Sequence, residues 1–129
     1  MEPIWLQQDV VIASHDESIA EHGGSHGIRD LGLLESALAR PRNLAAYAPV
    51  EPTLQRLAAA YAFGIASNHP FVDGNKRAAF IASVTFLRLN GLRLIAGTGD
   101  GYLIFIRLAE GSIDEEALAE WFTHHTLPA

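Results

Sequence analysis

The sequence contains no cysteine, so a disulfide framework, a thiolate metal site and a cysteine nucleophile are excluded. Long hydrophobic runs are also missing, because the longest, residues 57–66, is far shorter than the roughly 20 residues that span a bilayer. The first residues lack the basic start of a secretory signal peptide. We therefore expect a soluble, cytoplasmic protein with no membrane partner.

Basic residues are scarce. Eight arginines and a single lysine, Lys76, stand against 15 acidic residues, and the formal net charge is −6. This charge argues against broad binding to a nucleic-acid backbone, so we expect no direct nucleic-acid partner, although it does not exclude a local basic pocket. In a chain that otherwise uses arginine, the lone lysine raises the question whether its position requires an ammonium group.

The composition is that of a folded chain. Its 129 residues are 49% apolar and 19% charged, and they contain no repeat or low-complexity stretch. This length suits one domain over residues 1–129 with one core. We predict a mainly α fold, a compact helical bundle around a central buried helix, with a small extended flap.

Apolar spacing and helix-stop signals define the predicted elements. Helices are expected over residues 5–21, 31–40, 54–68, 75–90 and 102–108, and after a capping box of Ser112 and Glu115. Asp30 should cap the second helix and Pro41 should end it, which leaves residues 41–52 as a loop. The fourth helix is apolar nearly all round and is the predicted central helix. A short strand is expected over residues 93–96.

The inward-facing positions follow from the same spacing. They are Leu6, Val10, Ala13 and Ile19 in the first helix, Leu31, Leu34 and Leu38 in the second, and Leu118, Trp121 and Phe122 in the last.

The segment over residues 69–77, His-Pro-Phe-Val-Asp-Gly-Asn-Lys-Arg, is polar and charged, yet it separates the two most apolar predicted helices. A loop that opens a helix presents backbone N–H groups and the positive end of the helix dipole, which together favour an anion. Lys76 and Arg77 add positive charge there, and Gly74 permits close approach of a ligand. Asp73 offers a carboxylate for Mg²⁺, and His69 can accept a proton near neutral pH. Phosphoryl and nucleotidyl transfer need this set of groups.

This segment resembles the signature of the Fic/Doc (death-on-curing) family, His-x-Phe-x-Asp/Glu-Gly-Asn-Gly-Arg. Lys76 replaces the second glycine, and Phe80 stands where a typical Fic motif has a second arginine. Both departures resemble the Doc branch. Residues 15–38 and 86–91 also resemble Doc proteins, so the similarity covers most of the chain.

The resemblance implies a toxin of a toxin–antitoxin pair, similar to a kinase that phosphorylates a threonine on elongation factor Tu and stops translation. By position, His69 would be the general base and Asp73 the Mg²⁺ ligand. Gly74, Asn75, Lys76 and Arg77 would hold the phosphates of ATP. Related proteins also carry a flap that docks the target segment, and residues 41–52 are the predicted equivalent.

Simpler interpretations exist for each residue. His69 could only cap the third helix, residues 73–75 could form only a turn and an N-cap, and Arg77 could form an ion pair with Asp73 or Glu35. We expect structural or surface roles, and not metal binding, for His15, His22 and His26. Arg42 and Tyr47 are candidates for substrate contact, although exposed loop residues of this kind often have no such role.

Three functions remain open on this evidence. The first is a Doc-type protein kinase, the second is AMP transfer to a protein hydroxyl, and the third is a non-catalytic anion- or nucleotide-binding module. Many Fic proteins block their own nucleotide site with a helix carrying Ser/Thr-x-x-x-Glu. We find no such motif in a plausible helical context. Inhibition is therefore expected from a separate cognate antitoxin whose disordered C-terminal segment folds on binding.

Overall fold

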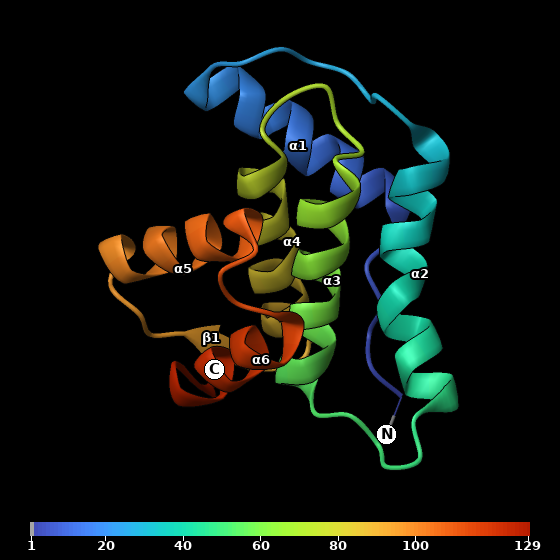
Figure 1. Cartoon of the computed structure of the whole chain (residues 1–129), viewed down its shortest axis with the longest axis vertical. Coiled ribbons are helices and arrows are strands. Elements are labelled where there is room, and N and C mark those ends of the chain that lie inside the picture. The colour runs from blue at the N-terminus through green and yellow to red at the C-terminus, as the bar shows by residue number, and fades with distance from the viewer. Residues whose placement is uncertain (1) are drawn as a thin grey trace.

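The computed structural model describes residues 2–129, apart from the side chain of Thr98 (Figure 1). In chain order the elements are α1 (Gln8–His22), α2 (Leu31–Tyr47), α3 (Leu54–Asn68), α4 (Asn75–Leu89), β1 (Leu92–Leu94), α5 (Thr98–Glu110), α6 (Glu115–His124) and β2 (Thr126–Pro128). The predicted mainly helical fold is confirmed. Among the described residues, no helix is both long and apolar enough to cross a bilayer.

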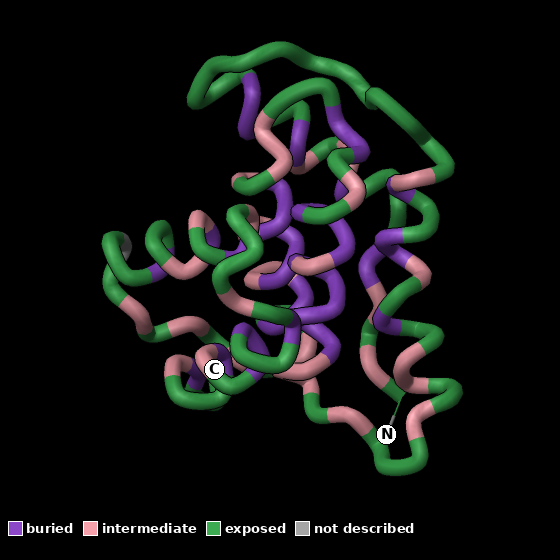
Figure 2. Tube along the Cα trace, in the orientation of Figure 1, coloured by how far each residue is buried: buried purple, intermediate pink, exposed green. Residues whose placement is uncertain are grey.

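The core is built around α3 (Figure 2). Every residue from Leu57 to Ala62 is buried, and α2, α4 and α6 pack around this helix. The Tyr61 hydroxyl is fully buried and accepts a hydrogen bond from the Leu6 backbone N–H at 3.1 Å, which ties the N-terminal segment to the core. The helix predicted as central, α4, packs along α3 and leaves Leu89 exposed.

The contact between α2 and α3 is close enough to favour a glycine. A Cβ atom at Gly64 would lie 3.1 Å from the Ala37 Cα atom, and Ala37 is itself buried. Two small residues therefore let the two backbones approach, and Leu34 and Ile65, close to them in sequence, are fully buried.

The prediction that Pro41 ends the second helix is wrong, because α2 continues through it to Tyr47. Proline inside a helix removes one backbone hydrogen bond and costs about 3 kcal/mol relative to alanine. The helix persists because Pro41 is fully buried and Leu44 and Ala45 pack against the core. The predicted loop is thereby shortened to the residues between Tyr47 and Leu54.

The inward face of α1 differs from the prediction. Leu6 lies in the extended segment before this helix, and Val10 and Ala13 are exposed. The buried residues are Val11, His15, Ser18 and Ile19, so only Ile19 matches within the helix. The buried face could not be recognised from apolar spacing, because two of its four residues, His15 and Ser18, are polar. In α2, Leu34 and Leu38 are buried as predicted, but Leu31 is exposed.

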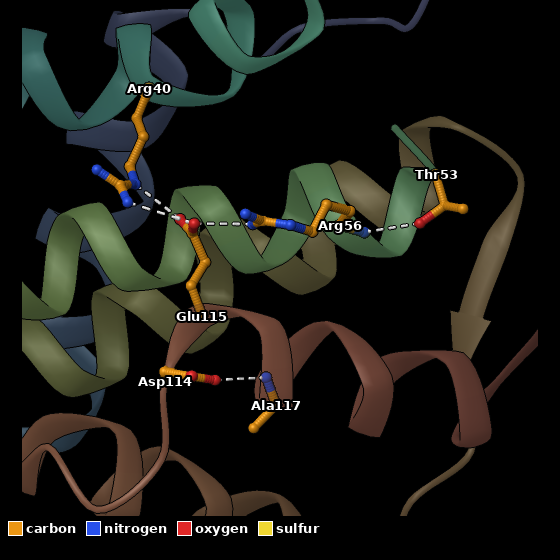
Figure 3. A network of polar contacts seen from close by, with 6 residues as sticks. All are labelled: Arg40, Thr53, Arg56, Asp114, Glu115 and Ala117. Carbon is orange, nitrogen blue, oxygen red and sulfur yellow. Dashed lines mark hydrogen bonds and ion pairs between the residues drawn. The ribbon is translucent and has the colours of Figure 1, made fainter. Parts of the chain in front are cut away.

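The C-terminal elements also refine the prediction. Residues 102–108 lie inside α5, as expected, and β1 is shifted to Leu92–Leu94 and pairs antiparallel with β2. Asp114, and not Ser112, caps α6 by accepting a hydrogen bond from the Ala117 N–H at 2.8 Å (Figure 3). Leu118 and Phe122 are buried as predicted, and Trp121 is partly buried.

Glu115 joins three helices, since it pairs at the start of α6 with Arg40 of α2 and Arg56 of α3 (Figure 3). Its carboxylate accepts a hydrogen bond from Arg40 Nε at 2.6 Å and lies 2.8 Å from Arg56 Nη1. Burial by itself raises the pKa of Glu115, but the hydrogen bonds and charges of the two arginines outweigh burial and lower the pKa below its usual value.

We predict that Glu115→Gln destabilises the native state at pH 7 by about 1–3 kcal/mol, because both guanidinium groups lose a charged partner. The pKa of Glu115 is lowered in the folded state, so its stabilising effect is present above the usual glutamate pKa. That effect is lost as the pH falls through the lowered value. Urea unfolding from pH 7 into acid measures both effects, with exposed Glu120→Gln as the control. Equal stability of the two variants at pH 7 would contradict the prediction.

Candidate active site

The motif segment connects α3 to α4, and its interior is anchored by buried residues. Pro70 and Phe71 are fully buried. The Asn75 side chain holds the loop closed, because its Oδ1 accepts a hydrogen bond from the Phe71 N–H and its Nδ2 donates to the Phe71 carbonyl, both at 3.0 Å. The Asn75 amide therefore shapes the loop.

A second segment, residues 23–30, lies on the motif loop (Figures 1 and 2). Ile28 and Phe71 form an antiparallel bridge. The Val72 N–H donates to the Gly27 carbonyl at 3.0 Å, and the Arg29 N–H donates to the Pro70 carbonyl at 2.7 Å. The glycines at positions 23, 24 and 27 all have positive φ, which suits a path that side chains would hinder.

The proposed flap equivalence of residues 41–52 is contradicted. Residues 41–47 belong to α2, and residues 48–53 precede α3, whereas the motif follows its other end. A helix of 15 residues separates the two by about 22 Å at 1.5 Å per residue. The segment that lies against the motif is instead residues 23–30. The sequence analysis did not predict this contact.

A cavity of about 570 Å³ opens where α1 ends and α4 begins, with α5 on its other side. Asp73, Gly74, Lys76 and Arg77 line one part of it, together with His22, Gly23 and Gly24, and Phe80, Gly101, Tyr102, Phe105 and Ile106 line the other. This size is in the usual range for small-molecule sites.

The start of α4 provides an anion site in this cavity. Gly74 is the N-cap residue with φ of 72°, and no described side chain caps the first turn. The first N–H groups of the helix are therefore available to a ligand. Arg77 Nη2 donates to the Gly23 carbonyl at 2.9 Å, and the buried Arg77 Nε has no hydrogen-bond partner among the described residues. Lys76 is exposed on the same turn.

Asp73 presents an ionised carboxylate beside this helix start. Oδ2 accepts a hydrogen bond from the Ser25 N–H at 3.1 Å, and Oδ1 accepts one from the Gly74 N–H at 2.8 Å. The hydrogen bond from Ser25 is the largest cause that lowers the pKa of Asp73, and the hydrogen bond from Gly74 and the nearby charge of Arg77 lower it further. Glycine is favoured at position 24, where the two segments meet, because its φ is 113° and a Cβ atom there would lie 2.9 Å from Asp73 Oδ2.

His15 contacts the backbone of Asp73, and the sequence did not identify this contact. Its ring is buried, stacks on Phe71 with centroids 3.8 Å apart, and places Nε2 2.8 Å from the Asp73 carbonyl oxygen. This agrees with the structural role expected for His15. His26 lies 3.5 Å from Asp16, and the described residues contain no cluster of three or more metal-ligating side chains.

His69 occupies the C-cap position of α3 and is exposed. Its φ of 49° makes it the one non-glycine residue with positive φ in residues 2–129. Arg29 stabilises this turn, because its Nε donates to the His69 carbonyl at 2.7 Å and its Nη2 donates to the Asn68 carbonyl at 2.8 Å. A non-glycine residue held in a left-handed conformation is a feature that clusters at functional sites.

The structure thus brings four of the six predicted site residues, Asp73, Gly74, Lys76 and Arg77, to one cavity. His69 and Asn75 belong to the same loop but do not line that cavity. The two candidates for substrate contact lie elsewhere: Arg42 sits over the Trp5 ring at 5.4 Å, and Tyr47 is the exposed last residue of α2.

Residues 5–87 match the family described as Fic/DOC family. The chain belongs to this family. It is 44% identical over 90 residues to "Toxin Doc" of Mycolicibacterium smegmatis (strain ATCC 700084 / mc(2)155), an alignment that covers 70% of this chain and 66% of that protein. It is 33% identical over 89 residues to "Protein kinase doc" of Escherichia phage P1, covering 69% of this chain and 70% of the relative. The chain therefore spans about two thirds of the length of each.

The two departures from the Fic signature both lie in the cavity of this family member. Lys76 occupies the first turn of α4 beside Arg77 and Gly74, and Phe80 lies one turn further along. A lysine side chain and an aromatic ring therefore line the cavity where the signature has a glycine and a second arginine. The family match ends at residue 87, before α5. The residues of α5 that line the cavity therefore lie outside the match.

We predict that Arg29→Gln loosens the His69 turn, because two charged hydrogen bonds to the end of α3 are lost. The native state should lose about 1–2 kcal/mol, and amide exchange should rise at His69, Phe71 and Val72 more than in the rest of the chain. Urea unfolding and hydrogen exchange measure these changes.

Two further variants test the cause. His69→Gly in the Arg29→Gln background should recover about 1 kcal/mol, since glycine adopts positive φ freely. Arg93→Gln, at an exposed position on β1, is the control. If Arg29→Gln resembles Arg93→Gln in both measurements, Arg29 does not hold this turn.

Proposed function

We propose that the chain is a Doc-type toxin enzyme that transfers the γ-phosphate of ATP to a serine or threonine hydroxyl of a translation protein. An elongation factor Tu-like protein is the proposed target. One observation carries this proposal: a single cavity combines the uncapped start of α4, Lys76, Arg77 and the ionised carboxylate of Asp73. Family membership and the names of the two relatives, a toxin and a protein kinase, support it.

The phosphates are assigned to the start of α4. The backbone N–H groups of the first turn, residues 75–77, and the side chains of Lys76 and Arg77 would hold them beside the N-cap residue Gly74, whose own N–H already donates to Asp73. Arg77 lines the cavity, and its hydrogen bond to the Gly23 carbonyl fixes its guanidinium group beside the helix start. The role of the Asn75 side chain is to shape the loop through Phe71.

Asp73 suits Mg²⁺ that arrives with the nucleotide. Mg²⁺ is commonly held by one or two carboxylates together with substrate phosphates, and Asp73 is an exposed carboxylate with a lowered pKa. The described residues offer no cluster of metal-ligating side chains that would hold the ion without a bound nucleotide. The ion would neutralise charge on the phosphates during transfer.

His69 is the proposed general base. The oxygen of the target hydroxyl attacks the γ-phosphorus, the bond to the β-phosphate oxygen breaks, ADP leaves, and the His69 imidazole accepts the hydroxyl proton. The exposed ring and the left-handed backbone held by Arg29 fit a residue that must meet a protein substrate.

His69→Ala should lower transfer by a factor of about 10²–10⁴ and abolish toxicity, while the fold persists, because the exposed ring contributes little packing. Initial rates of phosphate transfer by the purified variant, with circular dichroism as the check of folding, measure this. The control is His124→Ala, which changes an exposed histidine on α6. A rate close to the parent's would remove His69 from this role.

AMP transfer is the second candidate function, and Lys76 argues against it. Where the Fic signature has a glycine, an α-phosphate can lie deep against the helix start. Lys76 places a side chain and an ammonium group there, so the nucleotide must bind in a different pose. A reversed pose would present the γ-phosphate to the hydroxyl, and in-line geometry then determines the product.

We predict that ATP labelled at the γ-phosphate marks a protein in a cell lysate and that ATP labelled at the α-phosphate does not. Mass spectrometry of the target should find an added phosphate. Lys76→Gly should weaken or abolish this labelling. An AMP adduct formed by the unaltered chain would overturn the kinase proposal in favour of AMP transfer, and no label from either nucleotide would favour a non-catalytic binding module.

Control of the activity is assigned to a second protein. A cognate antitoxin with a disordered C-terminal segment would fold onto this chain and inhibit it. Support comes from the relative named as a toxin and from the cavity, in which no described side chain caps the start of α4. The cytoplasm, where translation takes place, is the proposed location.

A further inference from the structure

A second hollow, of about 530 Å³, lies between α2 and α3 and is here called the α2–α3 groove. It shares no lining residue with the nucleotide cavity. Along α3 its lining runs from Arg56 in the first turn to Ser67 and Asn68 in the last, and the next residue is His69. The groove therefore begins beside the turn that carries the proposed general base.

The groove carries positive charge that the fold does not fully neutralise. Two arginines, Arg40 and Arg56, share the one carboxylate of Glu115 (Figure 3). Glu115 is the single acidic side chain among the described residues that line the groove. Arg40 lies over the Phe63 ring at 4.7 Å, and its side chain remains 46% exposed. In a chain of net charge −6, this surface is locally favourable for an acidic ligand.

The α2 side of the groove offers an aromatic contact that the core does not use. Tyr47 lines the groove and is 84% exposed. Asn43 lines it one turn earlier on α2 and is also exposed. Tyrosine and arginine are enriched at protein interfaces, where one ring or guanidinium group supplies both apolar area and hydrogen bonds. The groove thus has the side chains of a surface that binds a protein segment.

We propose that the α2–α3 groove docks the protein target through a segment that carries acidic side chains two to five residues from the modified hydroxyl. The proposal rests on the transfer reaction proposed above and adds a determinant of its target specificity. It also gives a reason why His69 lies outside the nucleotide cavity, since the hydroxyl would reach His69 from the groove.

The spacing follows from the length of α3. Phe63, under Arg40, precedes Asn68 by about 7.5 Å along the helix axis, and Arg56 precedes it by about 18 Å. An extended peptide advances about 3.3 Å per residue. An acidic side chain about two to five residues from a hydroxyl at His69 would therefore lie level with the two arginines.

Fluorescence anisotropy with the full chain and no nucleotide tests the proposal. One probe is a threonine peptide with glutamates two to five residues away on both sides, and the other has glutamines at the same positions. The parent should bind the glutamate peptide at least about fivefold more tightly than the glutamine peptide, and added salt should reduce the difference.

Charge changes on α2 localise the binding. Asn43→Glu should weaken the glutamate peptide by a factor of about 2 to 5, because it places a like charge in the groove, and Asn43→Lys should strengthen it. Ala46→Glu is the matched control, because it adds the same charge at an exposed position of α2 that does not line the groove. Tyr47→Ala should weaken both peptides, since it removes the exposed ring. Circular dichroism checks that each variant folds.

The proposal is overturned if the parent binds neither peptide or both equally, or if Asn43→Glu and Ala46→Glu bind the glutamate peptide alike. Sedimentation addresses a second copy of the chain as the occupant, because a parent dimer that Asn43→Glu abolishes would assign the groove to self-association. Escape of Asn43→Glu from a cognate antitoxin, with the KM for the target unchanged, would assign the groove to the antitoxin instead.

The outcomes separate this proposal from the proposed function. Binding of the glutamate peptide that depends on position 43, in a chain that transfers no group, would uphold the groove and refute the transferase. Phosphate transfer to a lysate protein with the same KM in Asn43→Glu and Ala46→Glu would do the reverse.

Discussion

The pairing of residues 23–30 with the motif loop is the constraint on which the site depends. Backbone hydrogen bonds of Gly27 and Arg29 with Val72 and Pro70 place the two segments side by side. This pairing puts the Ser25 N–H on the Asp73 carboxylate and the Gly23 carbonyl within reach of Arg77. The positions of Asp73, the proposed metal ligand, and of Arg77, the proposed phosphate-binding arginine, are therefore set by a loop from a distant part of the chain.

Burial of α3 supplies the rigidity behind this loop. The helix ends at the motif, and its close crossing with α2 at Gly64 leaves little freedom to shift. Glu115 then ties α6 to both helices, and α5, which supplies one wall of the cavity, precedes α6 in the chain. The site is thus built from the motif, from the loop after α1 and from C-terminal elements that lie outside the family match.

Much of the fold followed from local patterns. Helices were predicted over residues 54–68 and 75–90, and are observed over residues 54–68 and 75–89, because their apolar spacing, Pro70 and the Asn90-Gly91 stop are strong local signals. Pro41 was misleading, because its cost as a helix breaker is local whereas the burial that offsets it comes from α3. His15 and Ser18 hid the inward face of α1, since a buried polar residue is visible only once its neighbours are known.

The sequence by itself determined the chemical groups of the candidate site, because His69, Asp73, Gly74, Lys76 and Arg77 occur in one short segment between two helices. Only the tertiary structure decided how they are arranged. Four of the five share a cavity with Tyr102 and Phe105, whereas His69 lies outside it on a turn held by Arg29. The physical reason is the sequence separation over which each interaction acts. Helix caps and apolar spacing involve residues close together in the sequence, whereas Gly24, Arg29 and Tyr102 reach this site from distant parts of the chain.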